Sequence, residues 1–413
     1  MPNFEKKIKV RPPIKIIDYN YNLPDDRIAK FPLENRDDSK ILIFKDNSIG
    51  ESKFSNLAEL LPENSMIVFN TTKVVPARII FKKESGAYIE IFCLEPYIPS
   101  EYNSSFAAKR TCSWVAVVGN AKRWRSGSVQ FNSNGDKDLE SINLTATVEE
   151  RRDDKFIVKF EWSGDKPFSE VMDLCGKVPI PPYLKRDSQP LDRERYQTLY
   201  ATNRGSVAAP TAGLHFTQKV IDQIDIRSII RKEVSLHVGA GTFIPVKSEM
   251  IHDHKMHSEP FSVTMDVIEA ILGKKIAGLP IISVGTTTTR TLESLYFLGI
   301  QCLENGFPSN VTQWEPYLKS SVYSVEESLN ALIEWMKQDG SSVLERKTEI
   351  IIVPGFKFRI VDILITNFHQ PQSTLLLLIS SFIGESWRAV YNYALKNEFR
   401  FLSYGDSSIL FRS

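Results

Sequence analysis

Two stretches in the C-terminal half of the chain each have the pattern of a buried strand, a polar turn and a helix, and these two units constrain the fold most. Residues 280–284 and 361–365 are apolar runs of strand length, and polar turns connect them to helical runs over residues 290–298 and 373–383. Alternating strands and helices indicate an α/β domain with a parallel sheet. Ligands of such sheets bind beyond the carboxyl ends of the strands, where helix N-termini present free N–H groups.

Shorter signals extend this domain on both sides. Residues 54–61 suit a short helix, and residues 66–69 suit a buried strand that ends at Asn70. Ser324 and Glu327 have the spacing of a capping box, which predicts a helix from this point through residue 336.

Residues 77–172 have a different pattern of residue types. Runs of β-branched and aromatic residues with partial alternation are separated by polar or glycine-containing turns, which is typical of a small barrel or sandwich. The Pro-rich stretch 176–183 then reads as a rigid connector. We therefore predict an α/β main domain, residues 1–76 and 173–413, with an inserted all-β, barrel-like domain, residues 77–172. The expected strands of the inserted domain lie at residues 87–94, 113–118, 144–148 and 156–162.

The composition limits which partners the protein can bind and in which cellular compartment it is expected. The formal net charge of +1 gives no global signal for nucleic acid, so any RNA contact must come from a local patch. The four cysteines are widely spaced without a Cys-x-x-Cys pair, which predicts free thiols in a reducing compartment. Residues 1–18 lack the apolar core of a signal peptide, and the longest apolar run, residues 375–383, is too short to span a bilayer. We expect a soluble, cytoplasmic protein of two domains, because 413 residues exceed one typical core.

The run over residues 204–216 combines small residues, one proline, two glycines and one histidine without helical or strand periodicity. Small residues let a backbone approach a ligand closely, and His215 has the side chain that titrates near neutral pH. This composition is typical of a substrate-lining loop. A tight structural turn with a hydrogen-bonded histidine is the other interpretation.

Further segments share this combination of small, polar and histidine residues, such as Val-Gly-Thr-Thr-Thr-Thr-Arg at residues 284–290. Together with the loop, they resemble the S-adenosylmethionine:tRNA ribosyltransferase-isomerases of queuosine biosynthesis over nearly the whole chain. The segments that carry the resemblance are residues 22–37, 69–78, 204–216, 234–243, 254–259, 284–294, 366–376 and 400–406.

The resemblance implies an α/β domain that carries an inserted β-barrel. It also implies that the ribosyl part of S-adenosylmethionine is transferred and isomerised onto the 7-aminomethyl-7-deazaguanine base of tRNA. Epoxyqueuosine-tRNA forms, and adenine and methionine are released. S-adenosylmethionine is then a co-substrate and tRNA a partner, with no metal and no membrane involved. We expect the protein to act as a monomer.

Such a reaction needs proton transfers, and histidine is the side chain whose pKa suits them. His215 is the first candidate, followed by His237 in a strand-like run and His369 after a strand end. A buried, structurally satisfied histidine is the alternative for each. Because its loop is polar and glycine-rich, replacing His215 is expected to slow turnover far more than it destabilises the fold. A solvated loop is favoured over a metal site for His252, His254 and His257, because no cysteine lies nearby.

The polar turns also predict the substrate contacts. Thr286, Thr287 and Arg290 follow a strand end, where N–H groups, hydroxyls and a planar guanidinium suit the methionine carboxylate or a tRNA phosphate. Asn70 and Arg78, at the start of the inserted domain, would recognise the nucleobase or a phosphate. Ordinary strand and capping roles are the alternative. The other predicted substrate contacts are Pro210, Thr211, Ala212, Gly213, Gly239, Gly241, Thr242, Thr366, Asn367, Phe368, Ser373 and Tyr404.

A basic turn of the inserted domain predicts contact with tRNA. Lys122, Arg123 and Arg125 surround Trp124, a combination that can stack on a base and bind phosphates. A solvated barrel turn would explain the same residues. Lys185 and Arg186, beside the Pro-rich connector, would extend the tRNA-binding surface.

Two segments depart from the family pattern. Asn-Thr-Thr-Lys at residues 70–73 replaces Asn-Asp-Thr-Arg, and Pro-Gln-Ser-Thr at residues 371–374 replaces Pro-Lys-Ser-Thr. The changes remove an acid and a cation near the expected site, so a divergent paralogue with another acceptor is an open alternative. A non-catalytic tRNA-binding module is the alternative from another class, although such a module would normally be more basic.

Overall fold

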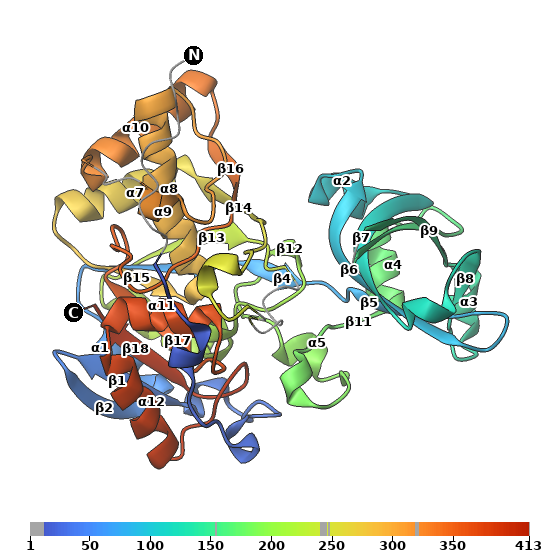
Figure 1. Ribbon diagram of the computed structural model, residues 1–413, viewed down its shortest axis with the longest axis horizontal. Coiled ribbons are helices and arrows are strands. Elements are labelled where there is room, and N and C mark those ends of the chain that lie inside the picture. The colour runs from blue at the N-terminus through green and yellow to red at the C-terminus, as the bar shows by residue number, and fades with distance from the viewer. Residues whose placement is uncertain (1–11, 153–154, 240–245, 247, 319–321, 413) are drawn as a thin grey trace.

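The computed structural model describes residues 12–152, 155–239, 246, 248–318 and 322–412, which form two bodies joined by a narrow neck (Figure 1). The larger body is an α/β domain, and the smaller body is a β-barrel with three short helices. The predicted fold class, an α/β domain with an inserted barrel-like domain, is therefore confirmed.

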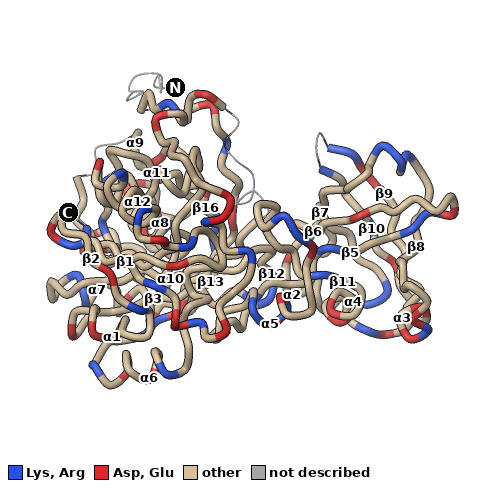
Figure 2. The backbone as a smooth tube through the Cα atoms, turned by 90° about the horizontal axis from the view of Figure 1, so that it is seen from below, with Lys and Arg blue, Asp and Glu red and all other residues tan. Residues whose placement is uncertain are grey.

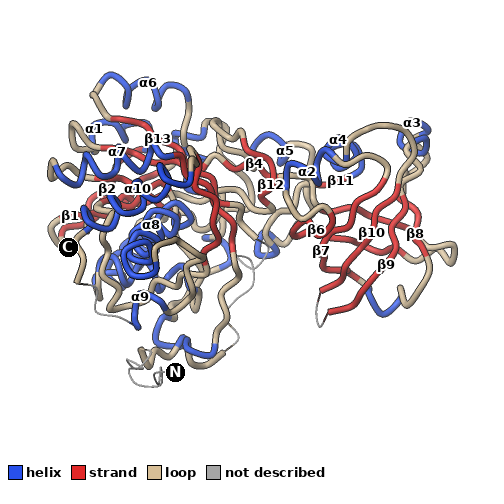
Figure 3. The backbone as a smooth tube through the Cα atoms, turned by 90° about the horizontal axis from the view of Figure 1, so that it is seen from above, coloured by secondary structure: helices blue, strands red, loops and turns tan. Residues whose placement is uncertain are grey.

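The α/β body is built on a nine-stranded mixed sheet, whose strands β13, β3, β15 and β17 are parallel neighbours. β3 and β15 are buried along their whole length, because helices cover both faces of the sheet (Figure 3). In order across the sheet the strands are β16 (Val343–Thr348), β14 (Glu259–Thr264), β13 (Ile230–Leu236), β3 (Met66–Asn70), β15 (Ile281–Val284), β17 (Ile363–Asn367), β18 (Ser407–Phe411), β1 (Lys40–Lys45) and β2 (Ser48–Lys53).

Alternate residues of β3 enter two different cores. Met66 and Val68 pack in the core shared by α7, α8, α10, α11 and α12, whereas Ile67 and Phe69 pack with α1 and α6 on the opposite face. The helices of this body are α1 (Leu57–Leu60), α5 (Asp192–Arg195), α6 (Gln218–Ile226), α7 (Met265–Ile276), α8 (Thr286–Asn305), α9 (Glu315–Leu318), α10 (Val325–Asp339), α11 (Thr374–Ile383) and α12 (Ser386–Lys396).

The start of α8 differs from the prediction. The sequence places a turn over residues 285–289, but the helix begins at Thr286, directly after Gly285. Gly285 has a φ of 91°, a backbone conformation that lets the chain turn from β15 into α8 without a longer loop. The hydroxyls of Thr288 and Thr289 bond the carbonyls four residues earlier, at 2.7 and 3.1 Å, so the threonines fit inside the helix. The predicted capping box of α10, by contrast, is confirmed.

The smaller body is a closed antiparallel barrel of six strands, in the order β5–β6–β7–β10–β9–β8 with β8 pairing back to β5. Its interior is filled by its own aromatic core, which includes Trp114, Phe160 and Phe168. β5 and β8 were not among the predicted strands, and the predicted domain boundaries at 77 and 172 stay a prediction. The elements are β5 (Arg78–Lys82), β6 (Tyr88–Ile98), β7 (Thr111–Gly119), β8 (Ser128–Phe131), β9 (Thr145–Arg152), β10 (Lys155–Glu161), α2 (Tyr102–Ala107), α3 (Lys137–Ser141) and α4 (Phe168–Cys175).

The segment that returns from the barrel pairs antiparallel with the first barrel strand at the neck. β4 (Thr72–Val74) lies parallel to β12 (Asn203–Ser206), and β11 (Gly176–Lys177) pairs with β5. Position 176 requires a glycine because the backbone of Pro76 approaches it closely: a Cβ there would lie 1.9 Å from the Pro76 carbonyl oxygen.

Candidate functional site

A cavity of about 150 Å³, here called the main cavity, lies where β15 and β17 end at the carboxyl edge of the sheet. It brings together three polar segments that the sequence analysis selected: the short helix η7 (Thr211–His215), the first turn of α8, and the turn after β17. The predicted residues that line it are Pro210, Thr211, Ala212, Thr286, Thr287, Arg290, Thr366, Asn367, Phe368, His369 and Ser373.

A buried ion pair forms one wall of the main cavity. Arg290, on the first turns of α8, donates through Nη1 to Oε2 of Glu259 and through Nε to the carbonyl of Ile350 at 3.1 Å. Both charged side chains are buried, yet Nη2 of Arg290 has no hydrogen-bond partner. A buried guanidinium nitrogen without a partner is costly, so this atom is well suited to an anionic ligand group.

Glu259 was not among the site residues predicted from the sequence. Glu259 opens β14, where the alternation of buried and half-buried residues puts it on the same face as Phe261 and Val263. An acid at an inward position of an alternating strand is the signal that would have found it. His254 and His257, assigned to a solvated loop, also line the main cavity, and burial lowers the pKa of His254.

The turn after β17 supplies a second group of polar atoms. Asn367 donates through Nδ2 to the carbonyl of Leu402 at 3.2 Å, while its buried Oδ1 has no hydrogen-bond partner. His369 Nε2 lies 3.1 Å from the hydroxyl of Thr366. Burial lowers the pKa of His369 to about 3, so its imidazole is neutral at physiological pH. Ser373 lines the cavity and also caps α11.

His215 lies behind the wall of the main cavity and not in its lining. The Asn367 amide is 3.2 Å from Nε2, and the Ser39 hydroxyl is 2.9 Å from Nδ1. The ring also packs on Phe54, with centroids 5.0 Å apart. Burial, together with the charges of Arg400 and Arg36, lowers the pKa of His215 to about 3. His215 is thus a neutral histidine whose two nitrogens are committed to neighbours.

His237 faces a different space, a cleft of about 1000 Å³ between the two bodies. Its ring stacks on Tyr102 of α2, with centroids 4.6 Å apart and planes at 10°. Burial lowers the pKa of His237 to about 4, and its Nδ1 has no hydrogen-bond partner. The three predicted catalytic histidines therefore lie in three separate environments, and only His369 lines the main cavity.

Several predicted substrate contacts lie away from the main cavity. Asn70 is fully buried, and its amide pairs with the backbone of Leu236 at 3.0 and 3.1 Å. Arg78 ion-pairs with Glu90 on the barrel at 2.9 Å, and Tyr404 donates to Asp192 at 2.7 Å. The remaining ones are Gly213, packed against Tyr200, Gly239, whose N–H lies 3.4 Å from Glu259, and Gly241 and Thr242, which fall outside the described residues.

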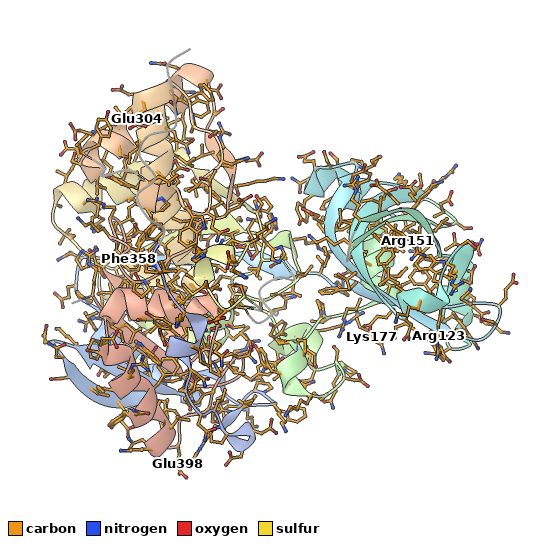
Figure 4. All side chains as sticks on the ribbon, viewed as in Figure 1. Arg123, Arg151, Lys177, Glu304, Phe358 and Glu398 are labelled. Atoms are coloured by element: carbon orange, nitrogen blue, oxygen red, sulfur yellow. The ribbon has the colours of Figure 1, made fainter. Side chains whose placement is uncertain are left out.

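The predicted tRNA-binding residues are dispersed. Lys122, Arg123 and Arg125 are exposed on the barrel, where Figure 4 labels Arg123, but the Trp124 ring is only 1% exposed. Stacking of a base on Trp124 is therefore wrong as a prediction, because that ring belongs to the barrel core. Lys185 and Arg186 are already ion-paired, with Asp25 and Asp192. Figure 2 shows basic and acidic residues interspersed along both bodies.

The residues that depart from the family pattern, Thr71, Lys73 and Gln372, are not in the lining of the main cavity. Thr71 is buried against β13, Lys73 belongs to β4, and Gln372 donates its N–H to the carbonyl of Tyr19. Within the described ranges, no cluster of three or more His, Cys, Asp or Glu residues is placed to hold a metal ion, and the predicted independence from metal stays a prediction. No helix in the described part of the chain is long and apolar enough to cross a bilayer.

Comparison with known proteins identifies the family. The model of the queuosine biosynthesis protein family matches residues 16–410. An S-adenosylmethionine:tRNA ribosyltransferase-isomerase of Halothermothrix orenii is 37% identical over 96% of this chain and 100% of its own length. Its counterpart from Trichlorobacter lovleyi is 34% identical over 95% of this chain and 98% of its own length.

A solved structure of S-adenosylmethionine tRNA ribosyltransferase from Thermotoga maritima covers 95% of this chain and 99% of its own, at 24% identity and a TM-score of 0.46. The match to that structure is loose, so the assignment depends on the sequence matches, which confirm the resemblance carried by the motifs. On those matches, the chain belongs to the queuosine biosynthesis protein family.

Proposed function

We propose that this chain is an S-adenosylmethionine:tRNA ribosyltransferase-isomerase that acts on 7-aminomethyl-7-deazaguanine in tRNA. Its products are then epoxyqueuosine-tRNA, adenine and methionine. The names of the full-length relatives support this activity. The single observation that carries the proposal is the unpaired, buried Nη2 of Arg290 in a cavity at the carboxyl edge of the sheet. A module that only bound tRNA would have no need of such a group inside a cavity.

The lining of the main cavity fits the methionine end of the donor. Arg290 offers a free guanidinium nitrogen for the carboxylate, next to the first turn of α8, whose Thr286 and Thr287 line the same wall. Glu259 offers a buried carboxylate for the α-ammonium group. An amino acid carries these two charges side by side, and the cavity presents their two complements side by side.

Other atoms suit the rest of the donor. The unpaired Oδ1 of Asn367 can accept from an amine or a hydroxyl, and Leu375, Leu378 and Ile352 give an apolar surface for the adenine ring. The bound donor supplies a sulfonium that acidifies the adjacent C–H groups. His369 is a neutral imidazole in the lining of this cavity, in the polar turn after β17, and is our candidate to accept a proton. His215 would act through Asn367 as a positioning residue, while His237 faces the cleft between the bodies.

We further propose that the acceptor is the base that the motif resemblance implies, 7-aminomethyl-7-deazaguanine, since residues 71, 73 and 372 are not in the cavity lining. We also propose a cytoplasmic, metal-independent monomer. Light scattering should then give a mass near 47.0 kDa, and chelators should leave turnover unchanged.

The test is incubation of the purified protein with S-adenosylmethionine and tRNA that carries 7-aminomethyl-7-deazaguanine. We expect release of adenine and methionine and a matching mass increase of the modified nucleoside. Guanine-containing tRNA serves as the control acceptor. Donor binding without adenine release on the correct tRNA would overturn the assignment in favour of another acceptor.

A further inference from the structure

A small hollow beside the main cavity is lined by three arginines that are distant in sequence. Arg36, Arg195 and Arg400 surround a volume of about 20 Å³, which is room for one oxygen-sized atom. Polar side chains complete the lining around the arginines, and we call this site the arginine pocket. Its other polar residues are Ser39, His215, Ser403 and Tyr404.

The positive charge of the arginine pocket is poorly neutralised. Among the described residues, neither Arg36 nor Arg195 has a carboxylate within ion-pair distance, and Arg400 reaches Asp406 only at 3.7 Å. The guanidinium of Arg36 instead donates to backbone carbonyls, including that of Gln197 at 2.6 Å. The Nε of Arg195 is buried without a hydrogen-bond partner. Like charges brought together without a counterion are costly, so the pocket is suited to an anion.

The pKa values of two side chains in the lining of the pocket reflect this charge. Burial and then the positive charge of Arg195 lower the pKa of Arg36. The pKa of His215 is lowered by burial and then by the positive charges of Arg400 and Arg36. Both directions agree with a positive potential inside the pocket.

The arginine pocket adjoins the main cavity. Ser403 lines both spaces, and Asn367 lines the main cavity while its amide contacts His215 at the pocket. A ligand group in the pocket would therefore lie one side chain away from whatever occupies the main cavity.

We propose that the arginine pocket binds a non-bridging oxygen of one backbone phosphate of the RNA substrate, close to the nucleotide that enters the main cavity. Guanidinium groups bind phosphate oxygens through charge-assisted hydrogen bonds. A chain with a net charge of +1 must concentrate positive charge locally to hold a polyanion, and Lys185 and Arg186 are already neutralised by acids. The proposal rests on the proposed function, because tRNA is the anionic substrate.

The test is the salt dependence of tRNA binding by wild type, Arg195→Gln, Arg195→Lys and the control Arg110→Gln. Arg110 is an exposed arginine of the barrel paired with Asp165. Loss of one phosphate contact should reduce the slope of log Kd against log salt by about 0.7–0.9 in Arg195→Gln. The charge-preserving Arg195→Lys and the control should keep the wild-type slope. Binding of S-adenosylmethionine should be unchanged in all of them.

An unchanged slope in Arg195→Gln, with wild type that binds tRNA and releases adenine, would overturn the arginine pocket alone. Failure of wild type to bind tRNA would overturn the proposed function and the pocket with it. Thermal melting identifies a folding defect, and if Arg195→Gln melts early, Arg400→Gln provides the same comparison. A reduced slope in Arg195→Lys as well would show that the residue acts by packing, which also contradicts the proposal.

Discussion

The barrel interior and the first half of α8, which forms part of the wall of the main cavity, differ in what they bury. Among the described residues of the barrel and its helices, 78–175, the buried polar side chains are Ser105 and Ser113, and the rest of the interior is apolar. The first half of α8 alone buries seven polar residues. Burying polar groups costs free energy unless each is hydrogen-bonded, so the hydrogen-bond partners of these residues show which of them serve the fold. Two of the seven, Thr286 and Arg290, line the main cavity. The seven are Thr286, Thr288, Thr289, Arg290, Thr291, Glu293 and Ser294.

A second contrast, within α8, shows which of these polar groups point to a ligand. The fully buried carboxylate of Glu293 accepts three backbone N–H bonds, from Arg359, Ile360 and Val361, at 2.8, 3.0 and 2.9 Å. Three residues earlier, Arg290 leaves one nitrogen unpaired. Burial of charge is therefore common to both, and the missing partner is what distinguishes a binding group from a structural one.

The largest effect is expected from Arg290→Met. It removes the donor's carboxylate partner and leaves Glu259 buried without a counterion, which costs about 3–5 kcal/mol of unfolding free energy. Calorimetric titration should show no S-adenosylmethionine binding. The double variant Glu259→Gln/Arg290→Met should recover stability but not donor binding, and Glu293→Gln should lose stability without losing binding. Wild-type donor affinity in Arg290→Met would remove the contrast between the two residues.

Paired histidine variants test the cavity boundary. His369→Gln should reduce the single-turnover rate of adenine formation by about 10²–10⁴-fold, the usual contribution of a positioned acid or base. The sequence predicts a similar rate loss for His215 with little loss of stability. The structure changes that expectation, because His215→Gln disturbs buried contacts with Ser39 and Asn367 and should lower unfolding free energy by about 1–3 kcal/mol. A His369→Gln enzyme at wild-type rate would exclude His369 as the proton acceptor.

Acid should destabilise the α/β body through its buried histidines. The pKa of His215 is lowered from 6.5 to about 3 and that of His369 to about 3. Between these values the unfolded chain binds more protons than the folded chain, so unfolding free energy is highest above pH 6.5 and falls as pH decreases. From pH 7 to pH 5, His215→Gln should lose about 2 kcal/mol less than wild type in urea unfolding. If wild type and His215→Gln lost the same unfolding free energy, His215 would be more accessible to solvent than its burial indicates.

The smallest effect is expected on the barrel surface. Alanine at Lys122, Arg123 and Arg125 should leave thermal stability unchanged, because all three side chains are exposed. The affinity for tRNA should fall only about fivefold at physiological salt, since exposed cations are screened. A filter-binding titration measures it. Unchanged affinity would leave the barrel without a tRNA contact at this turn.

The sequence predicted the elements that depend on local pattern. β3 and β15 were located within one residue because buried parallel strands are continuous apolar runs, and the α10 cap because Ser324 and Glu327 are three residues apart. It missed β5 and β8, which are short, and the start of α8, where threonine reads as a turn. The family was also predictable, because long motifs carry it.

The sites were less predictable, because their residues meet only in three dimensions. Arg36 and Arg400 are hundreds of positions apart, and Glu259 meets Arg290 across the sheet edge. A histidine in a promising motif gives no indication of which cavity it will face. His215, His237 and His369 reached three different environments from similar sequence contexts.

The neck of the molecule also has a mechanical consequence. The chain leaves for the barrel and returns from it side by side, through the antiparallel pairing of β5 with β11 and the close approach of Gly176 to Pro76. Two strands fastened together resist twisting, because rotation would shear their hydrogen bonds, whereas bending across the ribbon leaves the bonds intact. A short two-stranded ribbon thus connects the barrel to the α/β body. Bending is therefore the motion of the barrel that we expect to need the least energy, and the cleft where His237 stacks on Tyr102 lies between the two bodies.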